Sequence, residues 1–266
     1  MTVTVEKNGP VTTVIHARSE ARNAMDPESA DALTEAFLAF DQDPDAAVAV
    51  FWGAGGAFCA GWDLKYAASL VDQARPLAHL DFPEGKGSAP RGPLGPSRLE
   101  LTKPVIAAVA GPAVAGGMEL ALWCDLRVME EDAYFGVYCR RWGIPLLDGG
   151  TVRLPRLVGQ GRALDIILTG RKVEAEEAFR IGLCERIAPK GQARELAEAL
   201  AHEIARFPQE CVRADRQSVL LQHGLQVGEA LRREWDTSVH VIESEGAQGA
   251  ARFSSGKGRH GDFGNL

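Results

Sequence analysis

The sequence predicts an α/β fold with a mainly parallel core sheet, followed by a helical C-terminal region. Apolar stretches at 47–52, 105–109 and 125–130 are typical of buried strands, and helical patterns separate them. After residue 151 the pattern is almost entirely helical. We therefore expect a core over 1–200 that carries the functional site and a helical C-terminal region over 201–266.

The first elements of the predicted core are a hairpin and a capped helix. Stretches 3–7 and 11–17 flank Asn8-Gly9, a turn that favours antiparallel pairing. Asp26 suits a helix N-cap and Pro27 the first helical position. The apolar positions Leu33, Phe37 and Phe40 give that helix a face to bury.

The middle of the chain predicts a long loop between regular elements. A helix is possible at 66–74, whereas the Pro- and Gly-rich composition of 76–96 indicates a mobile loop that covers a pocket. A helix at 116–124 and a short strand at 133–136 follow. Later patterns predict five helices and one strand, at 161–169, 174–181, 193–207, 210–222 and 225–244 for the helices and 184–187 for the strand.

Bulk properties exclude several classes of function. The net charge of −7 argues against a nucleic-acid-binding role. Five widely spread cysteines without a Cys-x-x-Cys pair favour reduced thiols in a cytoplasmic protein, and neither they nor the six histidines have metal-site spacing. The N-terminus lacks a signal-peptide pattern, and no apolar run is long enough to cross a membrane.

Two segments rich in small residues indicate where the chemistry lies. They are Ala57-Phe-Cys-Ala-Gly-Trp-Asp-Leu64 and Gly111-Pro-Ala-Val-Ala-Gly-Gly-Met-Glu-Leu-Ala121. Gly116 and Gly117 open a predicted helix, whose first N–H groups are free and lie at the positive end of the helix dipole. Two such backbone donors, with the Glu119 carboxylate beside them, would stabilise the oxyanion of a thioester enolate.

These segments resemble the crotonase superfamily, whose best-known members are enoyl-CoA hydratases. The resemblance implies a ββα spiral core and a helical C-terminal trimerisation region over 201–266, which serves oligomerisation and closes the coenzyme A and acyl pocket. It also implies a homotrimer or a dimer of trimers. It implies that the N–H groups of Trp62 and Gly116 form the oxyanion hole. Coenzyme A enters as part of the acyl-CoA or enoyl-CoA substrate, and no cofactor is bound permanently. Residues implied to contact coenzyme A are Arg22, Ala24, Ala60, Gly61, Asp63 and Leu64, with Lys257 and Arg259 as candidates for its 3′-phosphate.

The resemblance is incomplete at the catalytic acids. Glu119 matches the first glutamate of enoyl-CoA hydratases, but Cys139 occupies the place of the second. Asp148, before Gly149-Gly150, is the candidate substitute, and an N-cap role for it is the simpler alternative. Arg140 or Arg141 could pair with Asp148 or bind a carboxylate on the substrate.

Three readings of the function stay open. In the first, Glu119, alone or with Asp148, moves protons or water as in a hydratase, or Glu119 alone supports isomerisation. In the second, Asp148 is the centre of an enzyme that forms or cleaves carbon–carbon bonds. The third is a non-catalytic acyl-CoA-binding protein.

Overall fold

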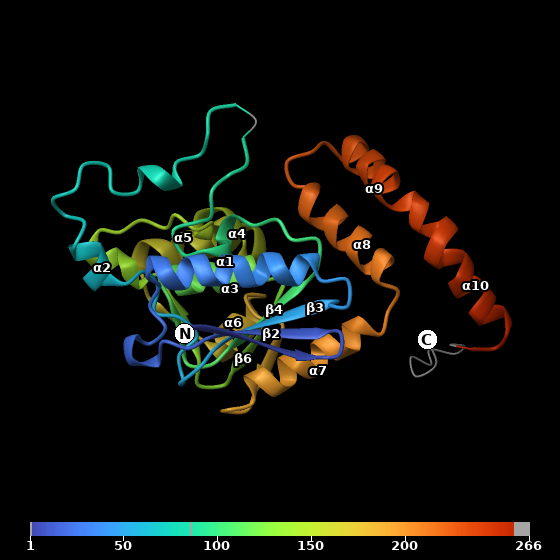
Figure 1. Cartoon of the computed structure of the whole chain (residues 1–266), viewed down its shortest axis with the longest axis horizontal. Helices are drawn as coiled ribbons and strands as arrows, with labels where there is room; N and C mark the ends of the chain where they lie inside the picture. The colour runs from blue at the N-terminus through green and yellow to red at the C-terminus, as the bar shows by residue number, and fades with distance from the viewer. Residues whose placement is uncertain (1, 86, 258–266) are drawn as a thin grey trace.

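The computed structural model describes residues 2–85 and 87–257, and it has the predicted α/β core followed by C-terminal helices (Figure 1). The main sheet has the strand order β1-β2-β3-β4-β6-β9, antiparallel between β1 and β2 and parallel elsewhere. Its strands are β1 (Val3–Asn8), β2 (Val11–His16), β3 (Val48–Gly53), β4 (Val105–Val109), β6 (Leu126–Glu130) and β9 (Arg186–Ala188).

Helices cover both faces of this sheet. On one face, α1 (Pro27–Gln42) packs Phe37 against Phe51 of β3, with the ring centroids 5.5 Å apart. Asp26 caps α1 by accepting a hydrogen bond from the Ser29 N–H, as its position before Pro27 predicts. On the other face, α7 (Ala193–Ala205) presents buried alanines, including Ala197 and Ala201, whose small side chains let the helix approach the sheet closely.

A second sheet of three short strands positions the functional site. It contains β5 (Pro112–Val114), β7 (Tyr134–Gly136) and β8 (Lys172–Glu174) in the order β5-β7-β8. The sequence pattern predicts β7 but not β5 or β8, which form strands through their pairing with β7. The helix α3 (Gly116–Trp123) begins two residues after β5, and the Ala115 N–H donates to Gly136 O at 2.7 Å. The start of α3 is thereby fixed to β7.

The region between α2 (Leu64–Ala68) and β4 is largely irregular. The helix expected at 66–74 is confined to the short α2. Apart from residue 86, which the structure does not describe, the helical turns of the predicted loop are two 3-10 turns, Ala78–Leu80 and Pro96–Arg98. In Figure 1 this segment extends away from the core before it returns to β4. Its returning end is anchored, since the Leu94 N–H donates to the Asp148 carboxylate at 3.0 Å.

Three helices connect the core to the C-terminal region. They are α4 (Gly150–Val158), α5 (Gln160–Thr169) and α6 (Ala175–Arg180). Gly149 occupies the N-cap position of α4 with φ +97°, and no side chain caps that helix. The N-cap role considered for Asp148 is therefore wrong, because its carboxylate bonds to the 94–97 segment instead.

The C-terminal helices depart from the core after α7. They are α8 (Gln209–Leu221), α9 (Val227–Val241) and α10 (Ala247–Ser254), with a π turn at Ile242–Gly246 that joins the last two (Figure 1). Helix α7 runs without a break through residue 200, so the change in architecture lies between α7 and α8. Arg216 ties α8 to the core through the Asp125 carboxylate at 2.8 Å and the Leu101 carbonyl at 2.7 Å.

Candidate active site

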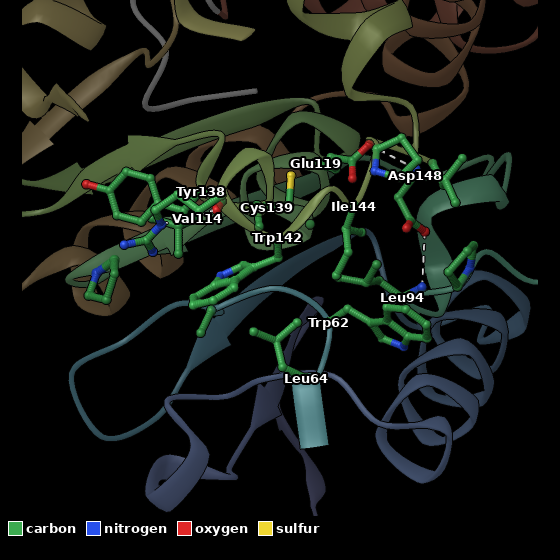
Figure 2. Close-up of a pocket in the computed structure, with 18 of the residues that line it drawn as sticks. Trp62, Leu64, Leu94, Val114, Glu119, Tyr138, Cys139, Trp142, Ile144 and Asp148 are labelled. Atoms are coloured by element: carbon green, nitrogen blue, oxygen red, sulfur yellow. Dashed lines mark hydrogen bonds between the residues drawn. The ribbon is translucent and has the colours of Figure 1, made fainter. Parts of the chain in front are cut away.

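A pocket of about 440 Å³ collects most of the residues that the sequence singles out (Figure 2). It lies where the 60–64 segment, the start of α3, and the 138–148 segment come together. Of the predicted site residues, those that line it are Arg22, Ala60, Trp62, Leu64, Gly116, Glu119 and Asp148. Sequence positions far apart thus converge on one cavity, which is the common arrangement of a ligand site.

The two segments rich in small residues meet, as their composition predicts. Gly61 has φ +90°, and a Cβ placed there would lie 3.0 Å from the Gly116 nitrogen and 2.8 Å from the Ala115 Cβ. A Cβ on Gly117 would lie only 2.0 Å from the Cys59 carbonyl oxygen. Both glycines are therefore required for the close approach of these backbones.

The two predicted oxyanion donors are available for a ligand. As the first residue of α3, Gly116 has no acceptor for its N–H within the helix. In the short β-bridge beside Trp62, the Met25 N–H donates to the Gly61 carbonyl and the Asp63 N–H donates to the Met25 carbonyl. The Trp62 N–H takes no part in this bridge. Within residues 2–85 and 87–257, neither the Trp62 nor the Gly116 N–H has an acceptor. An oxyanion hole requires two such backbone donors that are free to bind a ligand oxygen.

Glu119 lies in the first turn of α3 and is almost fully buried, with 2% of its surface exposed. Its Oε1 accepts hydrogen bonds from the N–H groups of Asp148 at 2.9 Å and Gly150 at 2.8 Å. Burial, followed by the charge of Asp148, raises the pKa of Glu119 to about 7, while these backbone bonds act in the opposite direction. A carboxyl group with this pKa can both accept and donate a proton near neutral pH.

Asp148 is the second buried acid of the pocket. Its Oδ1 accepts hydrogen bonds from the Leu94 N–H and the Ser97 hydroxyl, which join it to the end of the 76–96 loop. Burial raises the pKa of Asp148, and these two bonds oppose the rise. No pattern in the sequence points to Leu94 or Ser97 as partners, because about 50 residues separate them from Asp148.

The cations near Asp148 differ from those expected. Arg153 of α4 donates to the Asp148 carbonyl at 2.9 Å and to the Ser97 carbonyl at 2.8 Å, and Arg98 is also close enough to act on the pKa of the acid. Neither Arg140 nor Arg141 pairs with Asp148, so that expectation is wrong. The Arg140 Nε–H donates to the Ile167 carbonyl at 3.3 Å, whereas Arg141 lines the pocket.

Cys139 faces the same pocket from the position of the missing glutamate. The residue is 7% exposed, and Figure 2 shows it beside Glu119. Burial, followed by the charge of Glu119, raises the pKa of the Cys139 thiol. The thiol is therefore protonated at neutral pH and supplies no second charged acid or base.

Three of the residues implied to contact coenzyme A line the pocket, namely Arg22, Ala60 and Leu64. Ala24, Gly61 and Asp63 do not line the pocket. The Asp63 carboxylate instead caps α2 and pairs with Arg18 at 2.7 Å. Lys257 is exposed and lies outside the pocket lining, and Arg259 is beyond the described residues.

A family model described as enoyl-CoA hydratase/isomerase matches residues 6–257. The chain belongs to the enoyl-CoA hydratase/isomerase family. It is 36% identical over 255 residues to enoyl-CoA hydratase EchA19 of Mycobacterium tuberculosis, with 93% of this chain and 91% of that protein covered. It is also 36% identical over 234 residues to the (E)-benzylidenesuccinyl-CoA hydratase of Thauera aromatica, with 85% and 87% covered.

Solved structures agree with this assignment. The crystal structure of enoyl-CoA hydratase EchA1 from Mycobacterium marinum matches with a TM-score of 0.85, at 31% identity and with 96% of each chain covered. The comparisons confirm the resemblance to the crotonase superfamily, the fold class, and the prediction of an enzyme of the hydratase or isomerase type.

Two further predictions concern metals and membranes. No three His, Cys, Asp or Glu side chains of the described residues are grouped so that they could hold a metal ion. None of the described helices combines the length and the hydrophobicity that a membrane span requires.

Proposed function

We propose that this enzyme adds water to an enoyl-CoA thioester, with Glu119 as the acid and base and the Trp62 and Gly116 N–H groups as the oxyanion hole. The observation that carries this proposal is the position of Glu119. It is a buried carboxyl group with a pKa of about 7, one helical turn from the unoccupied Gly116 N–H and in the same pocket as Trp62.

The proposed reaction has two steps. Water forms a bond to C3 of the substrate, a water proton passes to Glu119, and the C2=C3 electron pair moves onto the thioester oxygen. Glu119 then returns the proton to C2 as the enolate collapses. Two preorganised N–H donors stabilise the intermediate charge, and loss of one such donor costs about 3 kcal/mol in comparable sites.

Asp148 is proposed to assist this reaction, as the second carboxyl group in the pocket. Its charge raises the pKa of Glu119, and its hydrogen bonds to Leu94 and Ser97 fix its position.

The names of the relatives favour addition or removal of water as the reaction. Two of them are hydratases, and the Salmonella typhimurium protein, at 37% identity over 206 residues, is a carnitinyl-CoA dehydratase.

Isomerisation is the second candidate, and a specific observation favours it. Cys139 stands where hydratases have their second acid, so of those two positions only Glu119 carries a carboxyl group. A single carboxyl group is enough to move a proton between two carbon atoms of an enoyl thioester.

The coenzyme A portion is proposed to lie against Arg22, Ala60 and Leu64, which line the pocket. Ala24, Gly61 and Asp63 would then support the backbone of this surface rather than contact the ligand through side chains.

The proposal also includes the assembly and the location of the protein. The assembly is a homotrimer or a dimer of trimers. The location is cytoplasmic, which the five free cysteine thiols favour.

Incubation with a panel of enoyl-CoA thioesters in heavy water tests these roles. We expect Glu119→Gln to lower kcat by about 10²- to 10⁴-fold, which is the usual contribution of a general acid–base group. The surface variant Glu35→Gln is the matched control and should keep wild-type turnover.

Four results would change the assignment. Solvent exchange at the α-carbon without hydration would favour the isomerase. Turnover lost in Asp148→Asn but kept in Glu119→Gln would favour the Asp148-centred chemistry. Thioester binding without exchange or turnover would indicate a binding protein, and absence of thioester binding would reject the proposal altogether.

A further inference from the structure

We propose that the acyl group of the substrate ends in a carboxylate and that Arg141 binds it, an inference that rests on the proposed function of the pocket. Arg141 lies on the short 3-10 helix Tyr138–Trp142 and is one of the residues that line the pocket. Tyr138, Cys139 and Trp142 of the same helix also line it. One wall of the pocket is thus a single short element that combines a cation with aromatic surface.

The guanidinium of Arg141 is held by two aromatic rings. Its Cζ lies 4.8 Å from the centroid of the Tyr138 ring and 5.7 Å from that of the Trp142 ring. Tyr138 in turn packs on Gly136, where a Cβ would lie 2.5 Å from a ring carbon. Contacts with ring faces leave the N–H groups on the edge of a guanidinium available, and this edge matches the geometry of a carboxylate.

Arg141 has no acidic partner among the residues that the structure describes. Its Nε–H makes one weak hydrogen bond, to the Tyr138 carbonyl at 3.4 Å. By contrast, Arg18, Arg171 and Arg216 are each within 2.8 Å of a carboxylate oxygen. A cation that is positioned over aromatic rings in a ligand pocket, and is not neutralised within the chain, favours an anionic ligand group.

The position of Arg141 favours the acyl group over the coenzyme A phosphates as the source of this anion. Arg22, the other pocket cation without an ion pair in the described part of the chain, lies beside the 60–64 segment, since the Ala60 N–H donates to the Arg22 carbonyl. Cys139, two residues before Arg141, is close enough to Glu119 for the charge of that carboxyl group to raise the pKa of the thiol. Figure 2 shows Tyr138 and Cys139 on one side of the pocket, with Cys139 next to Glu119. The Arg141 guanidinium lies at the Tyr138 ring, which Figure 2 shows on the far side of Cys139 from Glu119. Arg141 is therefore placed for the distal end of an acyl group rather than for the reacting carbons.

The same wall argues against a cationic acyl group. Four aromatic side chains line the pocket, namely Trp62, Tyr134, Tyr138 and Trp142, and aromatic surfaces of this kind can bind a quaternary ammonium ion. Arg141 already lies against two of these rings, however, and its charge would repel a second cation.

The test compares acyl-CoA thioesters of matched length that end in a carboxylate or in the neutral amide, over a series of chain lengths. We expect the wild-type enzyme to have a higher kcat/KM for a carboxylate member of the series. Arg141→Gln should lower that value by about 10- to 100-fold and change the value for the amide by less than about 2-fold, as for loss of a hydrogen bond to a charged group. Arg140→Gln, which alters the neighbouring arginine outside the pocket, should leave both values unchanged.

Two further arms separate the sources of the effect. The same acyl groups as pantetheine thioesters, which lack the nucleotide phosphates, should show the same loss in Arg141→Gln. An equal loss for carboxylate and amide that disappears with the pantetheine thioesters would assign Arg141 to a phosphate and overturn the proposal. A wild-type preference for a quaternary ammonium acyl group over the amide would also overturn it.

Binding measurements separate this inference from the proposed reaction. Dissociation constants of saturated acyl-CoA analogues do not depend on turnover. If no enoyl thioester is converted, a carboxylate preference in binding that Arg141→Gln removes would still support the role of Arg141. Equal binding of carboxylate and amide analogues to the wild-type protein at every chain length would reject it.

Discussion

At the scale of single residues, opposing effects act on the carboxyl group of Glu119. Burial favours its protonated form, and the backbone N–H groups of Asp148 and Gly150 favour its ionised form. Burial is the larger effect, so the pKa rises to about 7. The same side chain in water would be ionised at neutral pH and would be a poor proton donor.

This environment predicts that Glu119→Gln stabilises the fold at alkaline pH. Between pH 4.5, the ordinary value for this carboxyl group, and about pH 7, the native state binds more protons than the unfolded state. Stability therefore falls as pH rises through this window. Glutamine cannot ionise but can still accept both backbone bonds, so the variant should be more stable by about 2 to 3 kcal/mol near pH 8, with no difference near pH 4.5.

Urea unfolding at the two pH values measures this effect. Glu35→Gln, at an exposed position of α1, is the control and should show no pH-dependent gain. If Glu119→Gln changed the free energy of unfolding equally at both pH values, the pKa of Glu119 would not be raised in the native state.

At the scale of elements, the site depends on the contact between the 57–64 segment and the start of α3. The Val114 N–H donates to the Cys59 carbonyl at 3.0 Å, and Gly61 lies against the Gly116 nitrogen. Two backbones at this distance can present their N–H groups to one ligand atom. Any side chain between them would separate the donors.

The pair Gly61→Ala and Gly56→Ala tests this contact. Both glycines have positive φ, at +90° and +80°, so alanine is strained at either position by about 1 to 3 kcal/mol. A Cβ at 61 would in addition push against Ala115 and Gly116, whereas a Cβ at 56 has nothing within 4 Å. We expect similar losses of stability but a loss of kcat of at least about 10²-fold only for Gly61→Ala.

Thermal unfolding and steady-state kinetics of both variants give this comparison. A kcat close to the wild-type value in both variants would mean that the spacing of the two segments does not matter for turnover. A Gly56→Ala variant as inactive as Gly61→Ala would point to general loss of structure.

At the scale of the whole molecule, the C-terminal helices carry an apolar face that the described residues of the single chain leave exposed. On α9, Val227, Leu231 and Trp235 recur every four residues and are 74%, 59% and 63% exposed. Helix α9 packs on α8, and Glu245 accepts hydrogen bonds from the N–H groups of Glu210 and Cys211 in the first turn of α8. An exposed apolar stripe on a fixed helix favours association with another chain.

We therefore expect Trp235→Glu to lower the assembly state of the protein. The wild-type chain should sediment as a trimer or a dimer of trimers in analytical ultracentrifugation, and the variant as a smaller species with unchanged helical circular dichroism. Glu229→Gln, on the opposite side of α9, is the control and should keep the wild-type mass. A wild-type chain that sediments as a monomer at micromolar concentration would exclude this assembly.

The sequence by itself determined the features that depend on local backbone chemistry. Asp26 and Pro27 start α1, Asn8 and Gly9 turn the first hairpin, and the apolar runs form the central strands, because these signals act within a few residues. The two segments rich in small residues and Glu119 were also identified from the sequence, since close backbone approach requires small residues at fixed positions.

Only the tertiary structure decided how these parts act on one another. Strands β5 and β8 exist through their pairing with β7, which no pattern of three residues can reveal. The bonds of Asp148 to Leu94 and Ser97, and the place of Arg141 in the pocket wall, join residues that are distant in sequence. The pKa of Glu119 depends on burial and on the charge of Asp148, and both are set by packing of the whole chain.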